Sequence, residues 1–565
     1  TTEDDVRDHL RGFARTIPAF LMAYGDDKTT LANFEENIDE ATFKDLTSIT
    51  IEEFKKLRDG FEYVDEKGQE RKVPGLFNEV VFNASIREFM DTKDRLANYF
   101  DENLKEDIFD YIPPQKTNQI FTPKRVVKMM VDALEKENPE IFKDKTKKFA
   151  DLYAKSGLYI TEIVKRLNIG LKDEIPNEQE RIKWILENQV YACAPSDIIY
   201  NIVKEFVYGN LEGISTKNLI QLDTMKLASE EKLADKIYNA FGDDNLKFDV
   251  IIGNPPYQEE DGGAQSSARP IYHLFIQESK KLNPQYISYI TPSRWIVGGK
   301  GLDDFREEML NDSHLKEIHD WLTPEDIFPN TNIRGGVNYF LWASNYNNKN
   351  IRFVSYKNGR KISDVERPLA IKGIDIFLRD SIGIKVLEKI YANNYTDIDT
   401  ISGLVSPRKP FGLSGYFIDD ERYKSTPDNL KYPIICYARG WRKGYIERDI
   451  VTVRTEWIDR WKLFTPRANN IGTELADDNF NIRIGEPGTI CTESYMVIGA
   501  NEGFKRGEIE ALGKYLQTKF SRFLHSLAKG SQDATAKTYR FIPLQDFSNN
   551  SDIDWSKPII DIDEQ

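Results

Sequence analysis

The sequence has few of the residues that cross-link small secreted proteins or bind metals. Only three of its 565 residues are cysteine, and no CxxC pair occurs; they are Cys193, Cys436 and Cys491. The five histidines are equally dispersed. This usage excludes a disulfide framework, predicts no metal site, and favours a reducing compartment such as the cytoplasm.

Long apolar runs and a leader peptide are also missing. No stretch approaches the roughly 18 apolar residues that a membrane span needs, so we expect no membrane association. The chain starts Thr1-Thr2 without an initiator Met, a basic segment or an apolar core of a signal peptide. We expect it to be a piece of a longer polypeptide.

Charge is distributed unevenly along the chain. The net charge is −15, which by itself argues against a nucleic-acid partner. Residues 1–110 hold 15 Lys and Arg against 27 Asp and Glu, a local charge of −12. Residues 401–470 hold 13 against 8, a local charge of +5. One part of the chain can therefore attract a polyanion that another part repels.

The length of the chain and the changes in residue pattern along it predict three domains. Residues 1–110 are expected to be helical, because Val6, Leu10, Phe13 and Ile17 recur at helical intervals. Residues 111–395 alternate helical segments with short apolar runs, which is typical of an α/β fold with a largely parallel sheet. These runs are 190–193, 219–222, 248–252, 286–290 and 337–342. Residues 396–565 are rich in Gly, aromatic and Arg residues, and predict an α+β domain joined near 393–399.

One segment carries recognisable chemistry. The apolar run 248–252 leads into Gly253 and then Asn254-Pro255-Pro256-Tyr257. Two prolines remove two backbone donors, which leaves carbonyls free to accept from a ligand. The Asn254 side-chain oxygen and the Pro255 carbonyl can each accept one hydrogen of an exocyclic amino group, with Tyr257 on the face of its ring. Such contacts restore the nitrogen lone pair. A stiff strand exit without chemistry is the alternative.

This tetrad resembles the NPPY motif of S-adenosylmethionine-dependent amino-methyltransferases that methylate adenine N6 in DNA. Similar tetrads occur in enzymes that modify glutamine side chains or ribosomal RNA. The order of further motifs resembles the gamma class of restriction-modification or phage-defence systems, similar to type IIG. The resemblance implies a Rossmann-like class I methyltransferase domain, S-adenosylmethionine as cofactor, and double-stranded DNA as substrate after base flipping.

The expected cofactor residues follow from the same resemblance. Gln119-Ile120-Phe121-Thr122-Pro123 precedes an amphipathic helix, and Phe121, Thr122 and Pro123 would line the methionine end. Residues 149–157 lie where the family has D-P-x-x-G-S-G. Asp151, Ser156 and Gly157 match this pattern. Leu152 and Lys155 do not match, so the backbone at Lys155 avoids positive φ or the loop differs.

Two further positions are less constrained by the pattern. Asp223 stands where the family places a carboxylate that accepts from the cofactor's adenine amino group, and a turn-forming Asp is the alternative. The acidic residue expected directly after the second strand, which would hold the ribose hydroxyls of the cofactor, is missing. The segment that follows the strand offers only Ser196 or Asp197 for this contact. Phe328 matches a loop aromatic that would stack on the far face of an extruded base, with a core phenylalanine as the alternative.

The C-terminal region resembles the target-recognition regions of type IIG-like systems, whose closing segment is similar to residues 538–543. Arg439, Arg442, Lys443 and Arg467 are the DNA-binding candidates, with a solvated surface charge as the alternative for each. Residues 1–110 are similar to a helical connector between helicase and methyltransferase regions, which implies helicase or nuclease domains as partners. No GxxxxGK[ST] loop occurs in the chain.

The sequence therefore predicts a site-specific DNA adenine-N6 methyltransferase of bacterial restriction-modification or phage-defence type. Two alternatives remain open at this stage. One is a catalytically silent DNA-recognition or scaffold module that has lost the cofactor, because the loop at Leu152 and Lys155 is altered. The other is a methyltransferase acting on RNA or on protein glutamine.

Overall fold

The computed structural model describes residues 3–65, 67–114, 120–259, 268–296, 299, 301–329, 331, 333, 335–392, 398–472, 477–530 and 532–564. Gln119 of the proposed cofactor motif and residues 393–397 of the expected linker lie outside these ranges. The chain forms two compact units: a first unit of residues 1–293, 300–302 and 312–367, and a second unit of 294–299, 303–311 and 368–565. The expected boundary at residue 110 falls inside the first unit, and the three-domain division stays a prediction.

The N-terminal part of the first unit is a set of helices around an aromatic core. These helices are α1 (Glu3–Tyr24), α2 (Glu40–Thr47), α3 (Ile51–Asp59) and α4 (Glu79–Arg95). Phe13 and Phe20 of α1 contact Phe34, and Phe20 also contacts Phe43. The predicted helix near the N-terminus is therefore confirmed, and of the residues that indicated it Phe13 is buried while Leu10 and Ile17 are partly buried.

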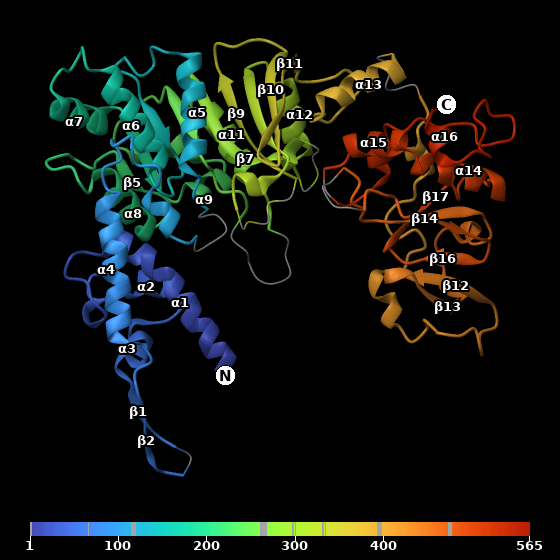
Figure 1. Ribbon diagram of the computed structural model, residues 1–565, viewed down its shortest axis with the longest axis horizontal. Coiled ribbons are helices and arrows are strands. Elements are labelled where there is room, and N and C mark those ends of the chain that lie inside the picture. Colours follow the sequence, from blue (N-terminus) through green and yellow to red (C-terminus); the bar gives the residue numbers. More distant parts are fainter. Residues whose placement is uncertain are drawn as a thin grey trace. The chain divides into compact units, whose positions relative to one another are not determined.

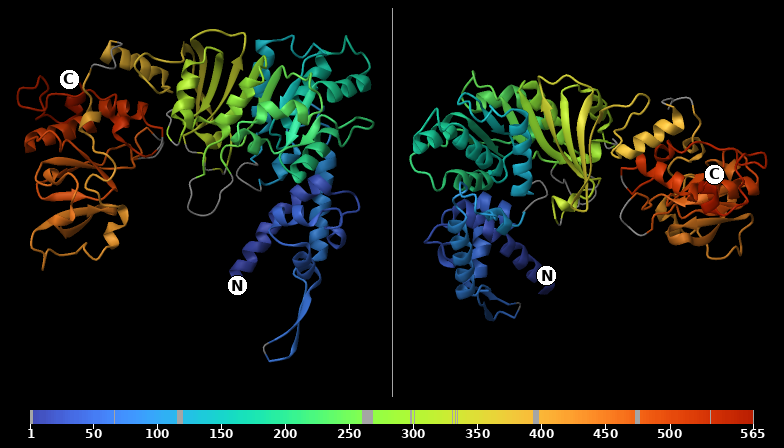
Figure 2. Two further views of the ribbon diagram at one scale, coloured as in Figure 1. Left: turned by 180° about the vertical axis from the view of Figure 1, so that it is seen from behind. Right: turned by 45° about the horizontal axis from the view of Figure 1, so that its top comes forward.

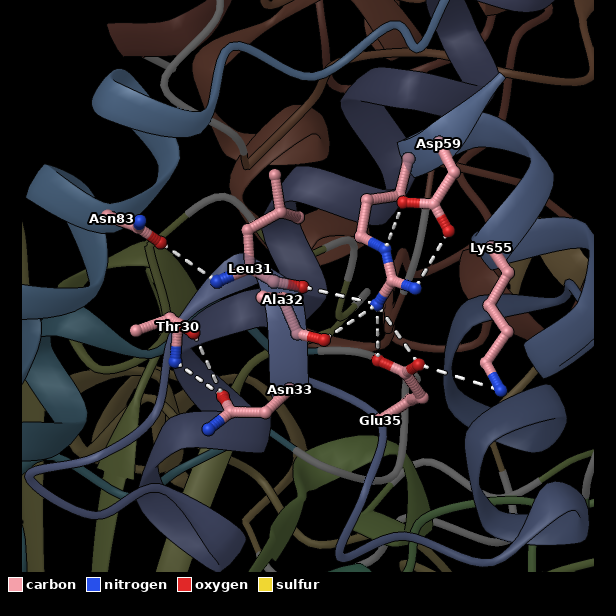
Figure 3. Close-up of polar contacts among 9 residues, drawn as sticks. Thr30, Leu31, Ala32, Asn33, Glu35, Lys55, Asp59 and Asn83 are labelled. Atoms are coloured by element: carbon pink, nitrogen blue, oxygen red, sulfur yellow. Dashed lines mark hydrogen bonds and ion pairs between the residues drawn. The ribbon is translucent and has the colours of Figure 1, made fainter. Parts of the chain in front are cut away.

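A polar network closes one side of this helical part. The Arg58 guanidinium donates to Glu35 at 2.9 Å, to the Ala32 carbonyl at 3.0 Å and to Asp59 at 2.8 Å. Figure 3 shows Glu35 near Ala32, and Lys55 reaches the Glu35 carboxylate from another side, at 3.7 Å. Because Glu35 is buried, its pairing with Arg58 offsets the cost of removing the carboxylate from water.

A β-hairpin interrupts the helices, which the sequence analysis did not predict. It consists of β1 (Phe61–Val64) and β2 (Glu70–Val73), paired antiparallel. The hairpin projects from the neighbouring helices in each view (Figures 1 and 2). Every residue of β1 is exposed, so no burial pattern distinguished this strand from the surrounding charged surface.

A nine-stranded sheet forms the centre of the first unit, in the order β11-β10-β8-β9-β7-β6-β3-β4-β5 (Figure 1). Strands β5, β4, β3, β6 and β7 run parallel, whereas β9 lies antiparallel between β7 and β8. The strands are β3 (Phe149–Asp151), β4 (Val190–Ala194), β5 (Leu219–Gln221), β6 (Val250–Gly253), β7 (Tyr286–Pro292), β8 (Leu315–Trp321), β9 (Val337–Ala343), β10 (Asn350–Lys357) and β11 (Arg360–Pro368). This order is that of a Rossmann-like class I methyltransferase fold, as predicted.

Helices cover this sheet and explain its apolar strands. They are α5 (Lys124–Glu137), α6 (Leu158–Gly170), α7 (Glu178–Asn188), α8 (Asp197–Tyr208), α9 (Thr224–Ser229), α10 (Leu233–Ala240) and α11 (Tyr272–Lys281). All residues of β4 and β6 are buried, because strands covered on both faces have no solvent side. Val126, Val127, Met130 and Leu134 form the buried face of α5, as their spacing predicts.

The second unit mixes short strands with helices, which confirms the expected α+β character. Two three-stranded sheets have the orders β13-β12-β16 and β15-β14-β17. The strands are β12 (Pro433–Ala438), β13 (Arg442–Glu447), β14 (Lys462–Pro466), β15 (Arg483–Gly485), β16 (Thr489–Cys491) and β17 (Tyr495–Ile498). The helices are α12 (Asp303–Asn311), α13 (Ser381–Tyr391), α14 (Arg506–Gln517), α15 (Lys519–Leu527) and α16 (Ile559–Glu564).

Two observations bear on the environment of the chain. All three cysteines are buried and none is bonded to another. Within the described ranges, no helix has both the length and the apolar character needed to cross a bilayer.

Candidate active site

The central strands β3 and β6 bring a proposed cofactor residue and a proposed catalytic residue to the same edge of the sheet. These strands pair in parallel, and β4 and β6 lie on opposite sides of β3. Ligands of open α/β sheets bind outside the carboxyl ends of the strands at such a reversal of strand order. Asp151 ends β3, and Asn254 directly follows β6. Both predicted residues therefore lie where the fold favours a ligand.

Asp151 is held in a close-fitting position. Its side chain is 2% exposed, and Oδ1 accepts from the Tyr153 backbone N–H at 3.1 Å. A Cβ atom at Gly253 would lie 2.8 Å from Asp151 Oδ1, so only glycine leaves room for the carboxylate there. Burial raises the pKa of Asp151, an effect opposed by the Tyr153 hydrogen bond and by the charge of Lys155.

The Asn254 side chain is fixed through its nitrogen and leaves its oxygen available. Nδ2 donates to Thr122 Oγ1 at 3.0 Å, and Thr122 lies 3.4 Å from the Tyr159 hydroxyl. Asn254 is 3% exposed, and no donor among the described residues reaches its Oδ1. A buried carboxamide oxygen without a donor is costly, and an incoming amino group satisfies it. Pro255 and Pro256 follow, and both are buried.

Tyr257 and Phe328 come together as the sequence suggested, but not as two parallel plates. Their ring centroids are 6.4 Å apart, and the rings meet at 71°, edge to face. Phe328 is 1% exposed and Tyr257 is half-buried. A flat base between parallel rings needs about 7–8 Å between them, at one van der Waals contact on each side. Entry of a base therefore requires the two rings to separate and reorient.

The proposed cofactor motif lies against this corner. The Phe121 ring lies 4.9 Å from the Phe109 ring, and Pro123 directly precedes α5. Ser156 Oγ accepts from the Leu158 N–H at 3.2 Å. Gly157 has φ 92° at the start of α6, and a Cβ there would lie 2.9 Å from Val207 Cγ2. Lys155 has no positive φ, so the loop meets its left-handed requirement at Gly157.

The structure gives the remaining cofactor candidates structural contacts: Asp223 and Ser196 cap helices, and Asp197 pairs with a tyrosine of α1. Asp223 is exposed and caps α9, with Oδ1 accepting from the Lys226 N–H at 3.0 Å. Ser196 caps α8 by accepting from the Ile199 N–H, and Asp197 accepts from the Tyr24 hydroxyl. The cap at Asp223 is the turn-forming role that the sequence left open, and its contact with the cofactor's adenine remains a prediction.

Three of the four DNA-binding candidates lie together on one turn of the second unit. Arg439 lies in the turn between β12 and β13, Arg442 and Lys443 begin β13, and all three are exposed. Arg467 is elsewhere, directly after β14, and lies 3.9 Å from the carboxylate of Asp533.

An aromatic stack supports this turn, and sequence reasoning missed it. The Trp441 ring stacks on the Tyr495 ring with 4.1 Å between the ring centroids. The guanidinium of Arg483, a residue of β15, lies 4.2 Å from the centroid of the Trp441 ring. Trp441 has φ 58° after Gly440 with φ 72°, a conformation that a bulky residue seldom adopts. Residues 441, 483 and 495 are far apart in sequence, so no spacing pattern could have found the stack.

The strand order, with an asparagine and two prolines at the reversal point, defines a class I amino-methyltransferase domain. Residues 162–328 match the family model of the Eco57I restriction-modification methylase. An uncharacterized adenine-specific methylase of Mycoplasma pneumoniae is 26% identical over 358 residues, covering 53% of this chain and 84% of that protein. Over these regions the chain is similar to adenine-specific restriction-modification methylases.

A second curated relative is much longer than the chain. The type II restriction enzyme and methyltransferase RM.Eco57I of Escherichia coli is 25% identical over 388 residues, which cover 54% of this chain but 38% of that protein.

Two solved structures align over most of the chain. The DrdV–DNA complex matches 96% of this chain and 66% of its own, with a TM-score of 0.49 at 11% identity. The type IIL enzyme MmeI in complex with DNA matches 94% and 79%, with a TM-score of 0.46 at 10% identity.

Proposed function

We propose that the chain transfers a methyl group from S-adenosylmethionine to N6 of adenine in double-stranded DNA, within a restriction-modification or phage-defence system. The observation that carries this proposal is the buried Asn254 Oδ1, which lacks a donor at the carboxyl end of β6. An exocyclic amino group supplies the missing donor, and no charged or metal-binding group is needed to hold it.

The residues of the corner suit the chemistry of amino-group methylation. Asn254 Oδ1 and the Pro255 carbonyl accept the two amino hydrogens, which concentrates the lone pair on the nitrogen that attacks. Because Thr122 holds Asn254 Nδ2, the side chain cannot rotate freely and its oxygen stays directed at the amino group. Tyr257 and Phe328 provide the aromatic surfaces that offset unstacking of the base.

The residues also fit the cofactor, as a carboxylate and an ammonium are buried in the same loop. S-adenosylmethionine supplies an electrophilic methyl group on a sulfonium. Thr122, Asp151, Ser156 and Gly157 would hold it beside Asn254, at the reversal point of the sheet. The chain's own contribution is to bring the amino nitrogen into line with the methyl group and to exclude water.

Substitution of the acceptor tests this assignment. In Asn254→Ala, we expect methyl transfer to DNA to fall at least about 100-fold, because the amino group loses one of its two acceptors. Binding of S-adenosylhomocysteine and of duplex DNA, measured by calorimetry, is expected to persist. The matched control is Asn103→Ala, an exposed residue that donates only to Asp101, and it should retain activity.

The same experiment separates the proposal from its rivals. Full methyl transfer by Asn254→Ala would contradict the role of this residue. A wild-type chain that binds duplex DNA but neither binds the cofactor product nor transfers a methyl group would be a silent recognition module. Transfer to RNA or to a glutamine-containing peptide, with none to DNA, would replace DNA as the substrate.

A further inference from the structure

Lys155 is one of the two residues, with Leu152, at which the cofactor loop departs from the expected pattern, and it is buried. It lies in the loop that follows β3, four residues after Asp151. Loop lysines are usually exposed, but this residue is only 7% exposed. Nζ lies 5.6 Å from the ring centroid of Tyr153 and 5.5 Å from that of Tyr257. The ammonium is therefore placed between the cofactor loop and the proposed catalytic tetrad.

This ammonium has an incomplete set of partners. It makes cation–π contacts only, since no acceptor within the described ranges forms a hydrogen bond or ion pair with it. Asp151 acts on it electrostatically without reaching ion-pair distance. An ammonium largely withdrawn from water is costly unless an anion or hydrogen-bond acceptors pair with it, and its N–H donors can serve an anionic ligand. Burial accordingly lowers the pKa of Lys155.

A second unsatisfied group adjoins the same tyrosine. Asn254 Oδ1 is a buried acceptor that no described donor reaches, whereas Lys155, a residue 7% exposed, has its ammonium against the rings of Tyr153 and Tyr257. They do not satisfy each other, and Tyr257 lies next to both. Two ligand groups of opposite character therefore fit this corner: an amino group for Asn254 and an anion for Lys155.

We infer that Lys155 is the counter-ion for the carboxylate of the cofactor's amino-acid end, while Asp151 faces its ammonium. This inference rests on the proposed function. A zwitterionic amino acid needs one fixed charge of each sign, and Asp151 and Lys155 supply them from one loop at the end of β3. A DNA phosphate is a poorer match, because the duplex backbone does not enter a site in which Lys155 and Asp151 are both buried.

Paired ligands test this assignment without relying on catalysis. S-adenosylhomocysteine carries the amino-acid end, and 5′-methylthioadenosine retains the adenosine and thioether but lacks it. By calorimetry we expect Lys155→Gln to weaken S-adenosylhomocysteine at least about 30-fold, a cost typical of removing one partner of a buried charge pair. Binding of 5′-methylthioadenosine should change less than about twofold. Lys143→Gln, at an exposed ion pair with Glu140, is the matched control.

If Lys155→Gln does not fold, the inference can be tested on the wild type by changing the ligand instead of the protein. The carboxamide of S-adenosylhomocysteine should bind the wild type at least about 30-fold more weakly than the carboxylate does, and Lys155→Arg should preserve that preference. Two results would overturn this inference and leave the proposed function standing. One is an equal loss of affinity for S-adenosylhomocysteine and 5′-methylthioadenosine in Lys155→Gln, and the other is a wild type that binds the carboxylate no better than the carboxamide. A wild type that binds none of these compounds would overturn the proposed function as well.

Discussion

At the scale of single residues, the tightest fit in the site is between Gly253 and Asp151. Gly253 ends β6 with a negative φ, so the requirement for glycine comes from space and not from backbone conformation. The carboxylate of Asp151 occupies the volume in which a Cβ would lie. The position of Asp151 is thus set by the residue that directly precedes Asn254.

We therefore expect Gly253→Ala to disturb the cofactor site. The added methyl group meets Asp151 Oδ1 at 2.8 Å, so the carboxylate or β6 must shift, at a cost of about 1–3 kcal/mol in unfolding free energy. S-adenosylhomocysteine should bind at least about 10-fold more weakly, as measured by calorimetry alongside thermal unfolding.

Gly12→Ala is the control for that substitution. Gly12 is exposed in α1, and no atom lies within 4 Å of the place that an added methyl group would take, so alanine should stabilise the helix by about 0.5–1 kcal/mol. Unchanged cofactor affinity in Gly253→Ala would contradict the close placement of Asp151.

At the residue scale, the sequence allows prediction where the chemistry is local. Asn254, Pro255 and Tyr257 belong to one four-residue segment, so the tetrad could be read from the sequence directly. The sequence also marked Lys155 as a departure from the pattern. Its burial against Tyr257 could not be anticipated, because that contact joins loops after two different strands.

At the scale of elements, the turn between β12 and β13 is the clearest basic feature of the second unit. Arg439, Arg442 and Lys443 are exposed there, and the stack of Trp441 on Tyr495 holds the turn in place. If this turn contacts DNA phosphates, its contribution must weaken as salt rises, because counterions are released on binding.

We expect the double variant Arg439→Gln/Arg442→Gln to weaken binding to duplex DNA. The slope of log affinity against log salt should decrease by about 2, one phosphate contact for each arginine. Arg506→Gln, an exposed arginine of α14 paired with Glu510, should leave the slope unchanged. An unaltered slope in the double variant would exclude the turn from phosphate binding.

At the element scale, the sequence predicted the buried strands better than the exposed ones. The predicted runs for β4, β5, β6, β7 and β9 lie close to the observed strand bounds. All but the edge strand β5 are almost fully buried, and strands covered on both faces are continuous apolar runs. The β1–β2 hairpin was missed in a region expected to be helical, since exposed strands carry no such run. Strand β3 was not predicted as a strand, because only Phe149 and Ala150 of its residues are apolar and Lys148 and Asp151 flank them.

At the scale of the whole molecule, acidic and basic segments are separated along the chain. The acidic excess of residues 1–110 belongs to the first unit, and the basic excess of residues 401–470 belongs to the second. A net charge of −15 is therefore compatible with DNA as a substrate if the second unit makes the phosphate contacts. The chain spans 38% of the longer curated relative, so attached nuclease or helicase activities remain proposals.

The most direct test of the account is mass spectrometry of nucleosides from duplex DNA incubated with the chain and S-adenosylmethionine bearing a deuterated methyl group. The account predicts label in N6-methyldeoxyadenosine, and its loss in Asn254→Ala. Label confined to methylated cytosine, or no labelled nucleoside from DNA while RNA or a glutamine peptide is labelled, would contradict it.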